Sequence, residues 1–379
     1  MRVRRVRLRD FRNYVRLDLD LEPGIVVFHG PNGAGKTNLL EAVCLAAQGD
    51  SPRARTTGEM VRLGAGVGFV GVEFAGREGA VRVEIGLSDS GERRVRINGA
   101  NKRRADLIGL APVEQFSTRD IEVIRGEPGA RRRLLDEEIC AVSRPYYFSL
   151  GRYRRAIDQR NRLLKDLRNG QARADGLAPW DRAAARYGAR VMLARRRFIC
   201  ALGPEAGRAL ERLSGGEGDF VIHYLPSIAL PMGQRGCGFE EDEPEVVEEV
   251  TKAIEDLLRK RRAEDVASGM SLHGPHRDEV ELMLDGRAVR TYGSQGQQRS
   301  CALAIRLGLS AVAQAMTGKV PVLLLDDVLS ELDARRRQGV FDACEGAEQV
   351  LISCCDPEDI PAEVRRESQV LEVRDGKVC

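Results

Sequence analysis

Several features that would place a chain in a membrane or in an oxidising compartment are missing from this sequence. No uninterrupted apolar run approaches the roughly 18 residues of a membrane span. The N-terminus alternates arginine with apolar residues, unlike the continuous apolar segment of a signal peptide. The nine cysteines form no Cys-x-x-Cys pair, which argues against a zinc site and a disulfide framework and favours reduced thiols. We therefore expect a cytoplasmic protein.

Strong charge of one sign is also lacking. The 60 basic and 57 acidic side chains among 379 residues leave a net charge of +3, so any attraction for nucleic acid must come from local patches. Arginine is dense in 1–12 and 93–104, and acidic residues are dense in 239–250. No internal repeat or sustained heptad pattern is present, which excludes an extended coiled coil.

The apolar content of 42% is enough for a sizeable core, in two domains or in one domain of two lobes. Short apolar or alternating segments predict strands over 3–11, 15–21, 24–30, 69–75, 80–87 and 93–97, with a helix over 37–48. A region of helical spacing follows over 127–213, then strands at 219–225 and 279–284, a helix over 298–316 and an apolar run at 320–325. This order predicts an α/β protein with a largely helical second lobe.

The segment HGPNGAGKT (29–37) has the G-x-x-x-x-G-K-T spacing of a phosphate-binding loop, between a buried strand and a helix. Glycines let the backbone curl around phosphate oxygens, and the helix N-terminus offers free N–H groups. Lys36 would neutralise the outer phosphates, and Thr37 would ligate magnesium. We therefore expect binding of ATP and Mg²⁺, with nucleotide contacts from Gly30, Asn32, Gly33, Ala34, Gly35, Lys36, Thr37 and Asn38.

A second buried strand ends in two carboxylates. Four apolar residues (322–325) precede Asp326, which would hold magnesium through water, and Asp327, which is placed to polarise the attacking water. A turn or helix-start carboxylate is the alternative interpretation of Asp327. Asp333 lies in the segment SELD (330–333), where a cassette ATPase carries the loop that crosses its dimer interface. The predicted catalytic residues are Lys36, Asp326 and Asp327.

The segment LSGGE (213–217) has the letters of a cassette ATPase signature loop, but its position is wrong. A signature should begin a helix that leads back to the magnesium strand, whereas Ser214 lies 112 residues before Asp326 and precedes a strand-like segment. Ser294, in YGSQGQQRS, lies 32 residues before Asp326 and opens a good helix. As the N-cap, Ser294 would face a phosphate of another subunit together with the N–H groups of Gly296 and Gln297. We interpret LSGGE as a loop between a helix and a strand.

With these segments in order, the chain resembles the RecF family of bacterial recombination mediator ATPases, which belongs with the SMC and Rad50 heads among cassette ATPases. The resemblance covers nearly the whole chain, and its most specific part is GPHRDE (274–279) followed by SQGQQR (294–299). Further matching segments are LRDFRNY (8–14), GPNGAGKTNLLEAV (30–43), SPRARTTGEMVRLG (51–64), GEPGARRRLLDEEI (126–139), YRRAIDQRNRLLK (153–165) and VLLLDDVLSELD (322–333).

The resemblance implies an ABC-type P-loop ATPase head with lobe I over 1–115 and 310–379, and a mainly helical lobe II over 116–309 that carries the signature. It implies an ATP-dependent DNA-binding protein of recombinational repair, replication-fork maintenance and the SOS response to DNA damage. Such a protein would be a weak DNA-dependent ATPase that forms a homodimer with ATP on gapped or junction DNA. It would work with RecO and RecR to load RecA.

Two other functions fit the sequence less well. The ATPase subunit of a membrane transporter would be nearer 250 residues, with LSGGQ close before the magnesium strand, a Glu after Asp326 and a His at the switch, and all four expectations fail. An SMC-like tethering head would need long arms or a zinc hook with Cys-x-x-Cys, and neither is present.

The resemblance also assigns roles to residues outside these motifs. Arg53 keeps the position expected to reach the bound phosphates, although Pro52 replaces the usual His or aromatic residue. Gln115 is the candidate magnesium-sensing glutamine, although FSTRDI (116–121) departs from the family pattern. The segment SCCD (353–356) replaces the usual Thr-rich or His switch, which leaves the sensor of the γ-phosphate open.

Other basic residues are candidates for contacts with DNA or a partner subunit. Residues His273, His276 and Arg277 form either a polar turn or a contact with DNA or the dimer partner. Contacts from Arg and Lys to phosphates would explain junction binding without base readout. Two charge-dense clusters are candidates for that role: Lys102, Arg103 and Arg104, and Arg131, Arg132 and Arg133.

Overall fold

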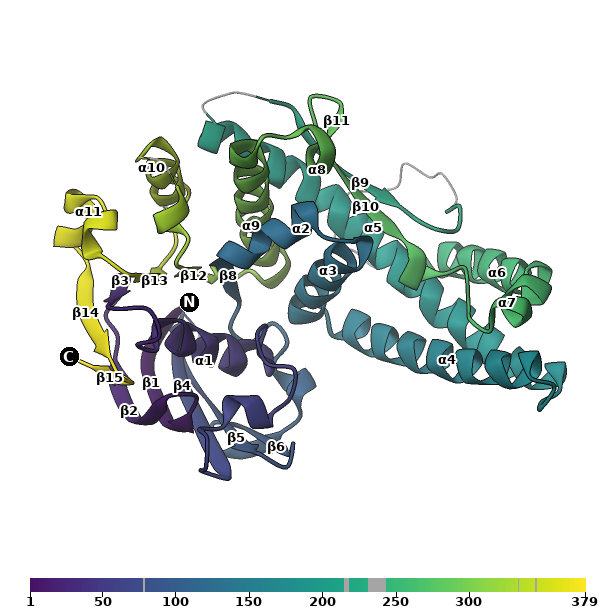
Figure 1. The fold of residues 1–379 in the computed structure, drawn as a ribbon, viewed down its shortest axis with the longest axis horizontal. Coiled ribbons are helices and arrows are strands. Elements are labelled where there is room, and N and C mark those ends of the chain that lie inside the picture. The colour runs from purple at the N-terminus through teal and green to yellow at the C-terminus, as the bar shows by residue number, and fades with distance from the viewer. Residues whose placement is uncertain (78, 215–217, 231–242, 333, 345) are drawn as a thin grey trace. The chain divides into compact units, whose positions relative to one another are not determined.

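The computed structural model describes residues 1–77, 79–214, 218–230, 243–332, 334–344 and 346–379 (Figure 1). The chain divides into two compact units. Unit 1 consists of Met1–Ile121, Arg208–Glu217 and Arg299–Cys379, and unit 2 of Glu122–Gly207 and Gly218–Gln298. The lobes expected from the sequence had boundaries at 115 and 309, so unit 1 includes three further segments, 116–121, 208–217 and 299–309. Two of them, 116–121 and 299–309, flank the expected boundaries. Arg306 and Asp120 form a 2.8 Å ion pair that ties these segments together.

A six-stranded sheet in unit 1 carries the predicted phosphate loop and carboxylates. Its strand order is β15-β14-β3-β13-β12-β8, and neighbouring strands are parallel from β14 to β8. Strands β12 and β13 are buried at every position, as expected when both faces of a parallel sheet are covered. The bounds are β3 Gly24–His29, β8 Val113–Ser117, β12 Val322–Asp326, β13 Gln349–Cys354, β14 Gln369–Arg374 and β15 Lys377–Val378.

The second sheet of unit 1 is antiparallel, with the order β2-β1-β4-β5-β6-β7. Its longer strands alternate buried and more exposed residues, so that one face packs on the core. The five strands predicted over 3–21 and 69–97 are present. The bounds are β1 Arg2–Phe11, β2 Tyr14–Asp20, β4 Val67–Gly76, β5 Gly79–Ser88, β6 Arg93–Ile97 and β7 Ala100–Lys102.

Helix α1 (Lys36–Gln48) packs against both sheets of unit 1 (Figure 1). Ten of its 13 residues are buried. Its apolar side chains share one core with residues of both sheets, such as Phe74 and Leu324. Gly49, in the left-handed conformation, ends the helix. Because α1 begins directly after the phosphate loop, this packing fixes the loop within the unit.

Helix α9 (Gln295–Thr317) begins in unit 2 and belongs to unit 1 from Arg299 onward. By length and composition it could cross a membrane, but 61% of its apolar window is buried within the protein, as in a core helix. The remaining helical elements of unit 1 are η1 Gly58–Met60, η2 Arg104–Leu107, η3 Thr118–Asp120, η6 Leu329–Glu331, α10 Ala334–Ala343, η7 Pro357–Asp359 and α11 Ala362–Arg366.

Unit 2 is mainly helical and includes an antiparallel sheet of order β11-β10-β9. Strands β9 and β10 coincide with the segments predicted at 219–225 and 279–284. The strands are β9 Phe220–Leu225, β10 Glu279–Leu284 and β11 Arg287–Ala288. The helices are α2 Ile121–Arg125, α3 Pro128–Val142, α4 Arg144–Arg168, η4 Ala174–Leu177, α5 Ala178–Ser214, α6 Pro244–Lys260, α7 Arg262–Ser268, η5 Pro275–Arg277 and α8 Val289–Tyr292. Helix α5 belongs to unit 1 from Arg208 onward.

The core of unit 2 contains buried ion pairs. Arg160 is fully buried and contacts Asp181 and Asp265, each at 2.7 Å. Arg195 contacts Asp136 at 2.7 Å and Asp278 at 3.3 Å. Removing one partner of such a pair costs about 3–5 kcal/mol, because the other charge is left buried alone. These pairs join helices and loops that are far apart in the sequence.

The cysteines only partly match the expectation of reduced thiols. Free thiols are present at Cys44, Cys140, Cys301, Cys344, Cys354, Cys355 and Cys379. Cys200 is disulfide-bonded, so the expectation is wrong at that residue. Spacing along the sequence did not reveal this bond, because pairing depends on proximity in the fold.

Candidate functional site

The phosphate loop connects β3 to α1 and has a backbone that requires glycine. Gly30 has a φ of 147°, and a Cβ atom there would lie 2.2 Å from the carbonyl oxygen of Val373. Gly35 has a φ of 119° and precedes α1 without a side-chain cap. No side chain among the described residues caps the N–H groups of the first turn of α1, which suits the binding of an anion. The Nζ of Lys36 donates to the carbonyl oxygens of Gly30 at 2.6 Å and Pro31 at 3.0 Å.

The turn between β1 and β2 supports the phosphate loop from outside. Asn13 Nδ2 donates to the carbonyl oxygen of Ala34 at 2.8 Å, and the hydroxyl of Tyr14 donates to the carbonyl oxygen of Gly35 at 3.0 Å. Burial raises the pKa of Tyr14, which keeps its hydroxyl protonated as a donor. These two residues belong to LRDFRNY, but the sequence alone did not show that this turn reaches the loop.

The predicted magnesium ligands meet at the carboxyl ends of β12 and β13. Thr37 Oγ1 donates to Asp326 Oδ1 at 2.7 Å, and Ser353 Oγ donates to the same oxygen at 2.8 Å. Burial raises the pKa of Asp326, and the hydrogen bonds from Thr37 and Ser353 oppose this effect. A hydroxyl and a carboxylate oxygen in contact are the kind of ligands that Mg²⁺ prefers, so these residues fit the ion.

Asp327 has a strained backbone and an unpartnered oxygen. Its φ of 57° lies in the left-handed region, which costs a non-glycine residue about 1–3 kcal/mol. Its N–H donates to Ser353 Oγ at 3.1 Å, which holds the turn. Its Oδ1 is buried, and no atom in the described part of the chain forms a hydrogen bond with it. An acceptor kept free beside Asp326 could orient a water molecule, which is the role predicted for Asp327.

A buried carboxylate on α1 organises the predicted phosphate-contacting arginine. Glu41 is fully buried and accepts from Arg53 Nη1 at 3.2 Å, while the same nitrogen donates to Asn38 Oδ1 at 2.9 Å. Arg12 contacts both oxygens of Glu41, at 2.6 and 3.0 Å. Ser51 Oγ is a further donor to Glu41, at 2.5 Å. Sequence reasoning missed Glu41 and Arg12, although a charged residue within the apolar helix 37–48 was a signal.

Cys355 lies beside the phosphate loop at the position where the sequence left the γ-phosphate sensor open. Its Sγ is 3.0 Å from Asn32 Oδ1 and 3.9 Å from Lys36 Nζ. Cys354, by contrast, is buried in β13. The strand end thus brings an exposed thiol to the outer end of the loop.

Gln115 does not stand directly beside the magnesium ligands. It lies inside β8 opposite Leu324, and its Oε1 accepts from Cys44 Sγ at 3.2 Å. Ser117 is the β8 residue that pairs with Asp326. The register of the sheet therefore makes Ser117 the nearer neighbour, which sequence reasoning missed.

The predicted signature segment forms a well-defined helix start. The N–H of Gln297 donates to Ser294 Oγ at 3.2 Å, and Gln297 Oε1 accepts from the N–H of Ser294 at 2.8 Å, forming a capping box. The buried amide of Gln298 donates to three carbonyl oxygens between Val289 and Gly293, at 3.1–3.3 Å. Ser294 and Gln297 are exposed and Gly296 is half-buried.

The other segment with signature letters, LSGGE, is only partly described. Ser214 ends α5, and residues 215–217 lie outside the described residues. Asp333 of the predicted interface loop also lies outside them.

The predicted DNA contacts have mixed surroundings. Residues Lys102, Arg103 and Arg104 are exposed, and Arg104 contacts Asp50 at 2.8 Å. Arg131 is only 8% exposed and contacts Glu279 at 2.9 Å. Arg132 is half-buried and donates to the carbonyl oxygen of Asp278 at 2.5 Å. Of the second cluster, only Arg133 is exposed, because the guanidinium group of Arg131 joins α3 to the start of β10 and that of Arg132 joins α3 to the residue before it.

The GPHRDE segment forms a polar turn within unit 2. His276 Nε2 faces the carbonyl oxygen of Ser271 at 3.0 Å, so it must donate, and Nδ1 accepts from the hydroxyl of Tyr153 at 2.6 Å. Burial lowers the pKa of His276, which agrees with this neutral form. Tyr224 donates to Asp278, the partner of Arg195. These contacts favour the structural interpretation of His276, whereas Arg277 is exposed.

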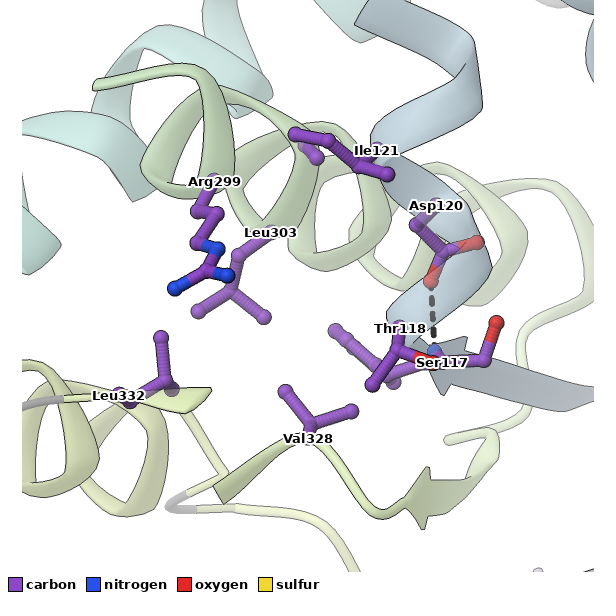
Figure 2. A pocket seen from close by; sticks show the side chains of 10 residues that line it. Ser117, Thr118, Asp120, Ile121, Arg299, Leu303, Val328 and Leu332 are labelled. Atoms are coloured by element: carbon purple, nitrogen blue, oxygen red, sulfur yellow. Dashed lines mark hydrogen bonds between the residues drawn. The ribbon is translucent and has the colours of Figure 1, made fainter. Parts of the chain in front are cut away.

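A small pocket of about 50 Å³ lies in unit 1 beside the loop that follows Asp327 (Figure 2). Figure 2 shows Val328 and Leu332 facing Leu303 of α9 across it, with η3 on a third side. The carboxylate of Asp120 accepts from the N–H of Ser117 at 2.7 Å. The pocket is mostly apolar and too small for a nucleotide, so it is not the phosphate site. It is lined by Phe116, Ser117, Thr118, Asp120, Ile121, Arg299, Ala302, Leu303, Val328 and Leu332.

The parallel sheet, the phosphate loop and the paired carboxylates define an ATPase head of the ATP-binding cassette class, as found in SMC proteins. The family model described as RecF/RecN/SMC N terminal domain matches residues 2–377. The chain is 37% identical to the DNA replication and repair protein RecF of Roseiflexus castenholzii, over 93% of this chain and 92% of that protein. It is 35% identical to the DNA replication and repair protein RecF of Synechocystis sp., over 100% of this chain and 98% of that protein. The chain belongs to the RecF family.

Solved structures agree with this assignment. The recombination mediator protein RecF of the RecFOR pathway, in a structure with ATPrS, is similar with a TM-score of 0.88 and 28% identity, over 100% of this chain and 97% of that one. A structure of RecF with ATP has a TM-score of 0.87, over 100% of this chain and 96% of that one. A structure of an SMC head bound to the C-winged helix domain of ScpA has a TM-score of 0.54 at 15% identity, over 100% of this chain and 97% of that one, and shares the fold alone.

Proposed function

We propose that this chain is an ATP-dependent DNA-binding protein that acts in the cytoplasm. Its processes are recombinational repair, replication-fork maintenance and the SOS response to DNA damage. The observation that carries the proposal is the 2.7 Å contact between Thr37 and Asp326, next to the unpartnered oxygen of Asp327, in a chain whose full-length relatives are DNA replication and repair proteins.

The residues of unit 1 account for the binding of ATP and its slow hydrolysis. Lys36 moves its ammonium group from the loop carbonyls to the outer phosphates, and the N–H groups at the start of α1 donate to phosphate oxygens. Thr37 and Asp326 would hold Mg²⁺, which would neutralise the charge that develops on the phosphates. Asp327 accepts a hydrogen bond from the attacking water and orients it. Arg53, held by Glu41, lies close enough to Asn38 to approach the same phosphates.

Two copies of the chain form a homodimer when ATP is bound. The capping box leaves Ser294 and the backbone of Gly296 at an exposed helix start, where they complement a phosphate of the other subunit. The dimer binds gapped or junction DNA, which stimulates its weak ATPase activity, and it works with RecO and RecR to load RecA.

Sedimentation velocity tests the proposal with wild type, Lys36→Met, Asp327→Asn, Ser294→Arg and Ser214→Arg, each with and without MgATP and gapped DNA. Wild type and Asp327→Asn should dimerise with ATP, while Lys36→Met and Ser294→Arg should stay monomeric and bind DNA weakly. Ser214→Arg is the matched control and should behave as wild type. Dimerisation of Ser294→Arg together with its loss in Ser214→Arg would contradict the assigned signature.

A further inference from the structure

Helices α4 and α5 of unit 2 carry exposed arginines that the proposed function does not use. Arg182, Arg186 and Arg190 follow one another at intervals of four along α5 and therefore lie on one face of it. Arg152 and Arg155 occupy neighbouring exposed positions on α4. Together with Tyr187, these five arginines form what we name the arginine face.

The two helices approach closely at this point. A Cβ atom on Gly188 would lie 3.2 Å from the ring of Tyr153, so a larger residue would push α5 away from α4. The close approach places Arg152 and Arg186 around one aromatic ring. Their guanidinium carbons lie 5.4 and 6.0 Å from the centroid of Tyr187, and Arg152 Nη1 donates to its hydroxyl at 3.4 Å. These contacts orient the two cations without neutralising them.

The charge of the arginine face is not balanced by carboxylates. From 182 to 203, α5 contains six arginines and no acidic residue. Of these six, Arg195 is buried with Asp136 and Asp278, whereas Arg182, Arg186 and Arg190 are exposed. Within the described part of the chain, none of the five arginines of the face has a recorded ion pair. On α4, Asp158 is the one acid between Phe148 and Arg162 in the sequence.

Aromatic side chains accompany these cations. Phe148 is 50% exposed, lies one turn before Arg152 on α4, and packs edge-on against Tyr147 with a centroid distance of 5.5 Å. An exposed aromatic side chain near unpaired arginines offers a base a surface on which to stack, while the arginines bind the phosphates on either side. Duplex DNA hides the faces of its bases, so this combination favours a single strand.

We propose that the arginine face binds single-stranded nucleic acid through its phosphates, with base stacking on the neighbouring aromatic side chains. This inference extends the proposed function, from which it takes the expectation that the partner is a nucleic acid. It assigns the single-stranded part of a gapped substrate to α4 and α5. Contact with the strand does not require ATP, because the residues of the face belong to unit 2 and are exposed without nucleotide.

Fluorescence anisotropy of labelled oligo(dT) and of a blunt duplex, without nucleotide, tests the proposal on the full chain. The triple variant Arg152→Gln/Arg186→Gln/Arg190→Gln removes three charges of the face. The matched control, Lys252→Gln/Arg259→Gln/Arg261→Gln, removes three exposed charges from α6 and its end, where each contacts an acid within four residues. Thermal melting establishes that both variants are folded.

The triple variant should bind oligo(dT) at least tenfold more weakly, and the slope of log K against log salt should fall by about 2, since each single-strand phosphate contact contributes about 0.7. The control should retain wild-type affinity and slope. Phe148→Leu should weaken binding of oligo(dT) about tenfold, whereas Phe148→Tyr, which keeps a ring, should restore most of it. Unchanged binding of oligo(dT) by the folded triple variant, or an equal loss in the control, would overturn the proposal.

Two further outcomes separate this inference from the proposed function. A loss confined to the blunt duplex would mean that the partner is a double strand, and the inference would be wrong. Lys36→Met should bind oligo(dT) as wild type does but fail to dimerise with ATP. If wild type does not dimerise with ATP while the triple variant still loses oligo(dT), the proposed function fails and the arginine face stands.

Discussion

Replacing Glu41 by Gln should destabilise unit 1 and disturb its nucleotide site at the same time. Glu41 is the fully buried acceptor for Arg12, Arg53 and Ser51. Gln has the same length but carries no charge, and its amide can accept through one oxygen only. The substitution therefore leaves two guanidinium groups without their counter-ion while changing the packing of α1 very little.

The expected cost follows from the exposure of the partners. Breaking a fully buried ion pair costs about 3–5 kcal/mol. Arg12 and Arg53 are 19% and 29% exposed, so water can solvate part of each charge, and the remaining amide oxygen keeps one hydrogen bond. We therefore expect a loss of about 2–3 kcal/mol in the free energy of unfolding, or roughly 5–10 °C in Tm for a unit of this size.

Thermal melting of the full chain, with hydrogen exchange to localise the change to α1, measures this effect. Glu363→Gln, on the exposed α11, is the control and should lie within about 0.5 kcal/mol of wild type. A double-mutant cycle with Arg12→Gln should give a coupling of about 1–2 kcal/mol. The affinity for ATP should fall as well, because Arg53 loses its anchor. A Tm within 1 °C of wild type, or additive effects in the cycle, would refute the reasoning.

Three further predictions concern the loop, the carboxylate and the signature. Gly30→Ala should abolish ATP binding and lower Tm, because its Cβ would meet the carbonyl of Val373 at 2.2 Å; equilibrium dialysis with ATP and thermal melting would show both. Burial raises the pKa of the Asp326 carboxyl group in the folded chain above its value in the unfolded chain. The stability that this group contributes is therefore present at pH values below its pKa in the unfolded chain, and it is lost as the pH rises through its pKa in the folded chain. Asp326→Asn should therefore raise Tm without nucleotide at neutral pH, less so in acid, and should eliminate ATP hydrolysis; a lower Tm at neutral pH would contradict this. Gln298→Ala should leave three carbonyls without their donor and cost about 1–3 kcal/mol; sedimentation should show ATP-driven dimerisation lost while ATP binding persists.

Local sequence order was sufficient to predict the parts of the site that are contiguous in the chain. The strand, loop and helix around Lys36 follow from glycine spacing and an apolar run, and Asp326 ends a strand that is apolar throughout. Contacts between distant segments could not be predicted in this way. The pairing of Arg12 with Glu41, for example, depends on how the turn before β2 packs against α1.

Charge density was a poor guide to which arginines are exposed. The cluster at 131–133 lies on a helix whose buried side faces β10, so Arg131 pairs with Glu279. The sequence did not indicate that Arg152 and Arg186 lie close together, because they are 34 positions apart. In the fold, both guanidinium groups contact the ring of Tyr187. The helical period of α5 was visible in the sequence, but the close approach at Gly188 was not.

The strand order of the parallel sheet has a consequence for the synthesis of this chain on the ribosome. The antiparallel sheet uses residues 2–102 and can pair while translation continues, but the two neighbours of β3 in its sheet are β13 and β14, both made after residue 348. The phosphate loop also waits for Val373 and Gly376, which close against Gly30 and Ala34. A nascent chain therefore carries the loop sequence for most of its synthesis without the strands that shape it, and competence to bind nucleotide should appear only near the end of translation.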